Sequence, residues 1–128
     1  MAVAFVHYIG AFSLVRLPPD SPLPMGAFAG RLCAITRTED ELSVICDTEH
    51  APSSVRVEHG WACLKVLGPL DVAIVGVMSS LAGALAEVNI ALLAISTFDT
   101  DYVLVRREHL ENAIAAWRAA GHTYNGAA

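Results

Sequence analysis

Apolar positions in the second half of the chain change their spacing several times, and each change predicts an element. The segment 61–67, WACLKVL, has the composition of a strand. From Val72 to Val88, apolar residues recur every three or four positions, which predicts an amphipathic helix. Asp71 directly precedes this pattern and predicts its N-cap, and Asn89 directly follows it and predicts its end.

Two short apolar runs follow, and a second helical pattern comes after them. Residues 90–97 and 102–106 are typical of strands, and residues 110–117 place Leu, Ile and Trp on one helical face. Gly121 predicts the end of that helix, and residues 122–125 predict a short edge strand. The predicted order is therefore β-α-β-β-α-β, which is typical of an α+β, ferredoxin-like sandwich.

The first half resembles a shortened copy of the second. With a shift of 60 residues, AITRTEDELSVI (34–45) aligns with AISTFDTDYVLV (94–105). The segment that would carry the first helix contains PPDSPLP, and prolines prevent a full helix there. We therefore predict an internal duplication, with a degenerate copy over 1–60 and a complete copy over 61–128 that share one core.

Composition excludes several classes of function. The chain of 128 residues has a formal net charge of −5 and only eight Lys and Arg, with no basic run. Nucleic acids and anionic membrane surfaces are therefore not expected as partners. Residues 72–96 are mostly apolar, but Glu87 and Asn89 interrupt them, so we predict a buried helix and a strand rather than a membrane span.

The three cysteines stand singly within apolar runs, at Cys33, Cys46 and Cys63. Their odd number and the absence of a Cys-x-x-Cys pair indicate reduced, buried thiols in a cytoplasmic protein. The N-terminal segment lacks a basic start and a clear cleavage site, so a signal peptide is not expected.

No catalytic motif is found. The five histidines form no zinc-ligand pattern, and the sequence has no phosphate-binding loop, no dinucleotide-binding loop and no nucleophile elbow. We therefore expect neither a cofactor nor a metal. Residues 98–101, Phe-Asp-Thr-Asp, join two predicted strands without a glycine. Asp99 and Asp101 suit either a solvated turn or a binding site, and spacing alone leaves both interpretations open.

Three segments carry a resemblance to a known family: RTEDELSVIC (37–46), WACLKVLGPLD (61–71) and AISTFDTDYVLV (94–105). Together with the predicted element order, they resemble the ACT domain. More narrowly, they resemble the small tandem ACT proteins whose eukaryotic relatives are the CASTOR cytosolic arginine sensors. The resemblance spans residues 11–121.

The resemblance implies that the chain binds an amino acid at the loop between the first strand and the first helix of its second copy. The segment Ser-Thr-Phe-x-x-Asp contributes to this pocket in the arginine sensors, and Asp71 stands where those sensors use an acidic residue. The implied ligand-binding residues of this chain are Gly68, Leu70, Asp71, Val72, Ile74, Thr97, Phe98 and Asp101. The first copy has Thr38 in place of Phe98, so at most one site is expected.

Three hypotheses follow. The leading one is a non-enzymatic, amino-acid-binding regulatory module that acts as a homodimer. The alternative is a protein-interaction or dimerisation module without a ligand, in which Phe98 would pack into its own core. The third is an enzyme of unrecognised type.

Overall fold

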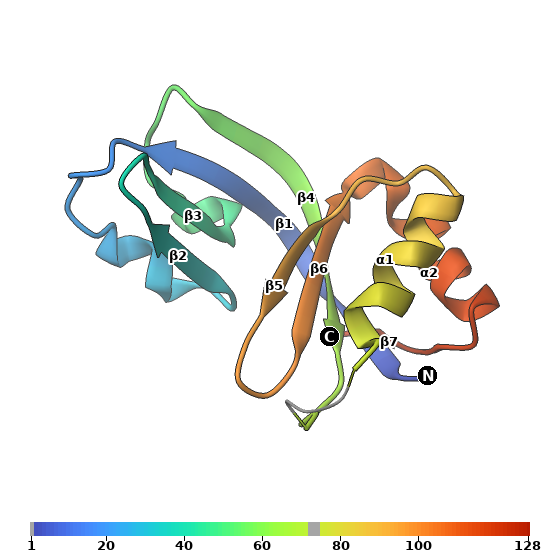
Figure 1. Ribbon diagram of the computed structural model, residues 1–128. Helices are drawn as coiled ribbons and strands as arrows, with labels where there is room; N and C mark the ends of the chain where they lie inside the picture. The colour runs from blue at the N-terminus through green and yellow to red at the C-terminus, as the bar shows by residue number, and fades with distance from the viewer. Residues whose placement is uncertain (1, 72–74) are drawn as a thin grey trace. The chain divides into compact units, whose positions relative to one another are not determined.

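The computed structural model describes residues 2–71 and 75–128. These residues form two compact units, one of residues 1–9 and 62–128 and the other of residues 10–61. Strands β1 (Ala4–Leu17) and β4 (Val57–Val66) each continue from one unit into the other. Figure 1 follows the chain from its blue N-terminus to its red C-terminus.

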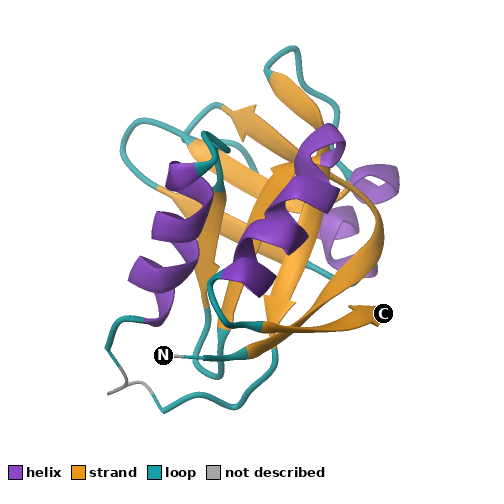
Figure 2. Ribbon diagram, turned by 90° about the vertical axis from the view of Figure 1, so that its right-hand side faces the viewer, coloured by secondary structure: helices purple, strands orange, loops and turns teal. Residues whose placement is uncertain are grey.

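The unit of residues 1–9 and 62–128 contains the predicted β-α-β-β-α-β order. After β4 come α1 (Val77–Glu87), β5 (Leu93–Ser96), β6 (Asp101–Arg106), α2 (Leu110–Ala119) and β7 (Thr123–Ala127). Strand β6 lies between β4 and β5, and β5 and β6 form an antiparallel hairpin in which Ser96 is opposite Asp101. The two helices lie side by side on one face of the strands (Figure 2). The predicted α+β, ferredoxin-like fold is confirmed for this unit.

The start of the first helix was predicted wrongly. The helix α1 begins at Val77 and not at Val72, and its N-cap is Gly76 and not Asp71. Gly76 has a φ of 89°, which is left-handed backbone that glycine adopts readily and that cannot continue a right-handed helix. The end of the helix is as predicted, because Asn89 follows it with a φ of 59°.

Alternation along the strands places one set of apolar side chains against the two helices. Leu64 and Val66 of β4 and Val103 and Val105 of β6 pack there with the buried faces of α1 and α2. Trp117 of α2 belongs to this core and is fully buried.

The N-terminal strand belongs to the same core. Residues 4–7 of β1 pair with β7 in parallel, and Leu67 donates its N–H to the carbonyl of Ala4 at 2.8 Å. The first strand of the chain therefore lies between β4 and β7. Phe5 contacts Trp117 edge-on, with ring centroids 4.9 Å apart.

A buried histidine connects this strand to α1. His122 accepts a hydrogen bond from the N–H of Val3 at Nδ1, over 3.1 Å, so its Nε2 carries the proton and donates to Ser80 Oγ at 3.0 Å. Burial, and secondarily the positive charge of the chain's amino terminus, lower the pKa of His122. The neutral form is therefore the one that the fold selects.

We expect this unit to lose stability in mild acid because of His122. Its pKa is lower in the folded chain than in the unfolded chain, so the unfolded chain binds more protons as the pH falls below about 6.5. Urea unfolding at a series of pH values should show a free energy of unfolding that is constant above that pH and falls below it. The variant His122→Gln should flatten this dependence and His50→Gln should not; equal slopes in both variants would contradict the assignment.

The unit of residues 10–61 has its own small core. Strands β2 (Cys33–Arg37) and β3 (Leu42–Asp47) form a hairpin, and β3 pairs antiparallel with residues 12–17 of β1. The proline-rich segment leads only to a five-residue 3₁₀ helix, Met25–Ala29, and two further 3₁₀ turns are Thr48–His50 and, in the other unit, Arg107–His109. Val15, Ala27, Val44 and Cys46 form the buried cluster.

The structure also bears on the predictions for cysteine and for the apolar segment. None of the three cysteines forms a disulfide; Cys46 and Cys63 are buried and Cys33 is partly exposed, and burial raises the pKa of Cys46 to about 11. Over residues 2–71 and 75–128, no helix is long and apolar enough to cross a membrane.

Candidate functional site

The turn between β5 and β6 is held by its two threonines. Thr97 donates its N–H and its hydroxyl to the carbonyl of Thr100, at 2.8 and 3.0 Å. The N–H of Thr100 donates in return to Thr97 Oγ1 at 3.2 Å. These bonds close the turn without a glycine, which leaves Phe98 and Asp99 at its tip free to project outwards.

The loop after β4 is fastened to this turn. Leu70 donates its N–H to the carbonyl of Asp99 at 2.6 Å, and Thr100 donates its buried hydroxyl to the carbonyl of Val66 at 2.7 Å. Gly68 is required at the crossing, because a Cβ atom there would lie 2.9 Å from the carbonyl oxygen of Asp99 and 3.0 Å from the nitrogen of Leu70.

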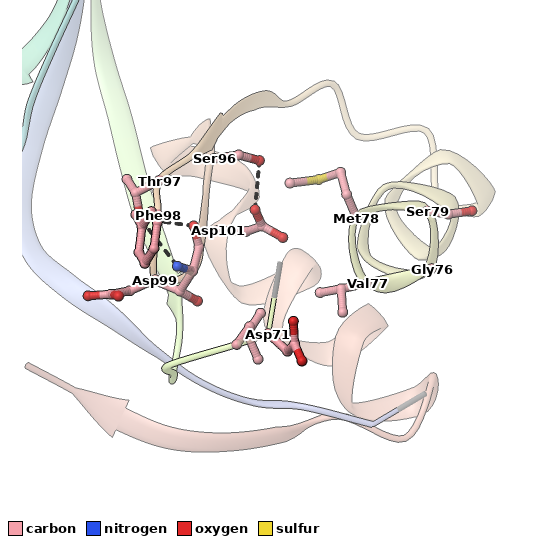
Figure 3. Close-up of a pocket in the computed structure, with 12 residues that line it drawn as sticks. Asp71, Gly76, Val77, Met78, Ser79, Ser96, Thr97, Phe98, Asp99 and Asp101 are labelled. Carbon is pink, nitrogen blue, oxygen red and sulfur yellow. Dashed lines mark hydrogen bonds between the residues drawn. The ribbon is translucent and has the colours of Figure 1, made fainter. Parts of the chain in front are cut away.

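A cavity of about 370 Å³ lies between this turn, the loop and the start of α1. Three segments of the chain line it: Leu70 and Asp71; Gly76, Val77, Met78 and Ser79; and Ser96, Thr97, Phe98, Asp99, Thr100 and Asp101. Figure 3 shows the Asp101 carboxylate and the Met78 side chain turned towards each other across this space. All of these residues belong to one compact unit.

The polar groups of the cavity are of two opposite kinds. On one side, Asp101 is partly buried and accepts a hydrogen bond from Ser96 Oγ at 2.7 Å. A carboxylate has about four acceptor positions, so this bond fixes its direction and leaves it able to accept others. On the other side, α1 begins without a side-chain cap, and the first N–H groups of a helix have no partner within it.

The apolar part of the cavity is formed by Val77, Met78 and Phe98. Val77 is buried and Met78 half-buried, whereas the Phe98 side chain is 87% exposed at the rim. The hypothesis of an interaction module without a ligand expected Phe98 to pack into its own core. The structure does not show this packing.

The structure brings together five of the eight residues that the resemblance implied. Leu70, Asp71, Thr97, Phe98 and Asp101 all line the cavity. Gly68 does not line it, but its close contact positions the loop that does.

The remaining two implied residues are Val72 and Ile74. Both lie outside the described residues, so the structure has no bearing on them.

The sequence did not indicate a site role for the residues at the true start of the helix, Gly76 to Ser79, or for Ser96. Ser96 could have been found, because residues opposite each other in an antiparallel hairpin share a face and Ser96 is opposite Asp101. Met78 lies within the apolar pattern of the predicted helix, and no pattern distinguishes a core methionine from one that faces a cavity.

Among the described residues, no group of three or more His, Cys, Asp or Glu side chains is placed to hold a metal ion. The cavity instead offers carboxylates, backbone N–H groups and an apolar wall. That combination suits a small organic molecule that carries both charges.

Comparison with known proteins agrees with this fold. The family model described as ACT domain matches residues 56–118, and a second model, described as an N-terminal domain, matches residues 10–54. The structure of protein Atu0741 from Agrobacterium tumefaciens is 33% identical over 98% of this chain and 94% of that one, with a TM-score of 0.91. Residues 56–118 of this chain are an ACT domain, and the chain belongs to the same family as protein Atu0741.

More distant structures share the fold of this ACT-domain protein. The ligand-free regulatory subunit of aspartate kinase from Thermus thermophilus has a TM-score of 0.68 and 14% identity, over 94% of this chain and 99% of that one. The Vibrio cholerae protein VC0802, described as a possible transport protein, has a TM-score of 0.72 and 17% identity, over 93% and 90%. No curated protein matches the sequence significantly.

Proposed function

We propose that this ACT-domain protein is a non-enzymatic regulatory module that binds a free amino acid in the cavity beside α1. The main observation behind the proposal is that Asp101 and the uncapped start of α1 line opposite sides of one small cavity. The two sides complement the two charges that every free amino acid carries.

The carboxylate of the ligand would lie at the start of α1. The aligned peptide dipoles place partial positive charge at a helix N-terminus, and the unpaired N–H groups there donate to an anion. The ammonium of the ligand would lie at Asp101, which Ser96 already orients. Hydrogen bonds between two ionised groups are about twice as strong as neutral ones.

The rest of the cavity determines which side chain the ligand can carry. Met78 and Val77 contact an aliphatic stem, and the exposed ring of Phe98 can close over it or stack on a cationic end, which is worth about 0.5–2 kcal/mol. The volume of about 370 Å³ is near the lower end of the usual range for ligand pockets and suits a molecule of this size.

The comparisons support a regulatory role at the level of the family. The chain contains an ACT domain, and the Thermus structure that shares its fold is a regulatory subunit. We further propose that the module acts as a cytoplasmic homodimer. An aromatic side chain as exposed as Phe98, at the rim of an incompletely enclosed cavity, is typical of a surface that a partner covers.

Loss of the Asp101 charge should abolish ligand stabilisation. We expect one or a few of the twenty amino acids to raise the melting temperature of the wild-type chain, since a ligand at a hundred times its Kd stabilises by about 2.7 kcal/mol. In Asp101→Asn, the same amino acid should bind at least about tenfold more weakly. A thermal-shift screen at millimolar concentrations, followed by calorimetry of any amino acid that binds, measures both effects.

The matched control is Glu87→Gln, which removes the same charge at the far end of α1. It should bind like the wild type. If no amino acid shifts the melting temperature, the chain is better explained as an interaction module without a ligand. Sedimentation of the same samples, with and without the amino acid, tests the homodimer.

We also propose the narrower relationship to tandem ACT proteins related to the CASTOR sensors. With a shift of 60 residues, β2 and β3 coincide with β5 and β6, as expected of two copies of one hairpin. A crystal structure tests this, because two copies require residues 33–47 to superpose on residues 93–107 together with the strands beside them.

A further inference from the structure

A second cavity, of about 350 Å³, lies on the other side of the turn between β5 and β6. Strand alternation separates the two cavities. Lys65 lies between Leu64 and Val66, which pack against the helices, so its own side chain is on the opposite face of the sheet. Tyr102 precedes the helix-facing Val103 and lines the second cavity for the same reason.

Lys65 is the only lysine of the chain, and two aromatic rings hold it in this cavity. Its ammonium nitrogen lies 5.9 Å from the ring centroid of Tyr8 and 6.0 Å from that of Tyr102. Among the described residues, it forms no ion pair with a carboxylate. A half-buried lysine whose ammonium lies over aromatic rings and has no carboxylate partner is placed to bind an anionic group.

Asp99 supplies the opposite charge. It lines both cavities, but Figure 3 shows its carboxylate turned away from Met78 and Val77, and so away from the first cavity. Burial, chiefly, and a side-chain hydrogen bond with Tyr8 raise the pKa of Tyr102 to about 12.

We infer that this second cavity is a separate binding site for a small zwitterion of the amino-acid class, with the ligand carboxylate at Lys65 and the ligand ammonium at Asp99. The two side chains line one cavity without pairing with each other, so a molecule with both charges can bridge them. The inference does not depend on a ligand in the first cavity.

The test is an NMR titration that reports the two cavities separately. A ¹⁵N-lysine label gives a single backbone amide signal, from Lys65, and ¹⁵N-tyrosine and ¹⁵N-methionine labels report Tyr102 and Met78. The probes are the twenty amino acids, with acetate and ethylammonium as molecules that carry only one of the two charges. At least one amino acid should move the Lys65 and Tyr102 signals at millimolar concentration. Neither acetate nor ethylammonium should move these signals as far at the same concentration.

Variants then decide which cavity binds the ligand. Lys65→Met and Asp99→Asn should each weaken the response of the Tyr102 signal by about tenfold or more, whereas Asp101→Asn and the charge control Arg107→Met should leave it unchanged. The inference is overturned if no amino acid moves these signals, if acetate alone moves them equally, or if Asp101→Asn abolishes the response and Lys65→Met does not. Movement of Met78 alone would overturn the inference and still support the first site.

Discussion

Replacing Trp117 with alanine is expected to lower the free energy of unfolding by about 3–5 kcal/mol, the usual cost of removing a large aromatic side chain from a core. Trp117 is fully buried. It contacts Phe5 edge-on and donates its Nε1–H to the carbonyl of Leu81 at 3.0 Å. It therefore joins α2 to both α1 and the N-terminal strand.

Chemical denaturation followed by circular dichroism measures this loss. Trp117→Phe separates the two contributions, because it keeps a ring beside Phe5 and removes only the hydrogen bond to Leu81 and part of the volume, so its loss should be smaller. The control is Phe28→Ala, which truncates a half-exposed aromatic ring and should change stability by less than about 0.5 kcal/mol. A Trp117→Ala protein as stable as Phe28→Ala would show that this core is not where the stability lies.

The parts of the fold that the sequence predicted are those with a strong local period. Spacing predicted the hairpin of β5 and β6, the helix α2 and the edge strand β7, and the predicted bounds lie within a few residues of the observed ones. The start of α1 was not predicted correctly, because the apolar pattern continues through Val75 while Gly76 adopts left-handed backbone. A hydrophobic period identifies a buried face but does not reveal where the backbone leaves the helix.

Pairing between residues far apart in the chain also could not be predicted from the sequence. The N-terminal strand pairs with β7, and the bond from Val3 to His122 joins residues 119 positions apart. Nothing within residues 1–10 indicates that partner, since an apolar stretch of that length is equally compatible with a strand or a helix.

Family resemblance supplied candidate residues for the site, and the structure places Thr97, Phe98 and Asp101 around one cavity. That these residues bind a ligand stays a prediction. The two acids of the turn do not share one strand face, because Asp101 belongs to β6 whereas Asp99 lies in the turn, where strand alternation does not apply. Asp101 lines the first cavity, and Figure 3 shows the Asp99 carboxylate turned away from Met78 and Val77.

Gly68→Ala is expected to damage both the loop and the first cavity. The new Cβ would lie 2.9 Å from the carbonyl oxygen of Asp99 and 3.0 Å from the nitrogen of Leu70, and both are backbone atoms that cannot turn aside. The loop must therefore move off the turn, which lengthens the hydrogen bond from Leu70 to Asp99. We expect stability to fall by about 1–3 kcal/mol, as for other overpacked sites, and stabilisation by the amino acid to be lost.

The control for Gly68→Ala is the same substitution at Gly83, which lies in α1 with open space where a Cβ would be. Alanine is a better helix former than glycine, so Gly83→Ala should raise stability by about 0.5–1 kcal/mol. Opposite signs in thermal and urea unfolding would show that the effect at Gly68 comes from close contact and not from the chemistry of the substitution. Since a ligand in the first cavity needs Leu70 and Asp71 in place, a Gly68→Ala protein that binds as tightly as the wild type would mean that the loop does not form the site.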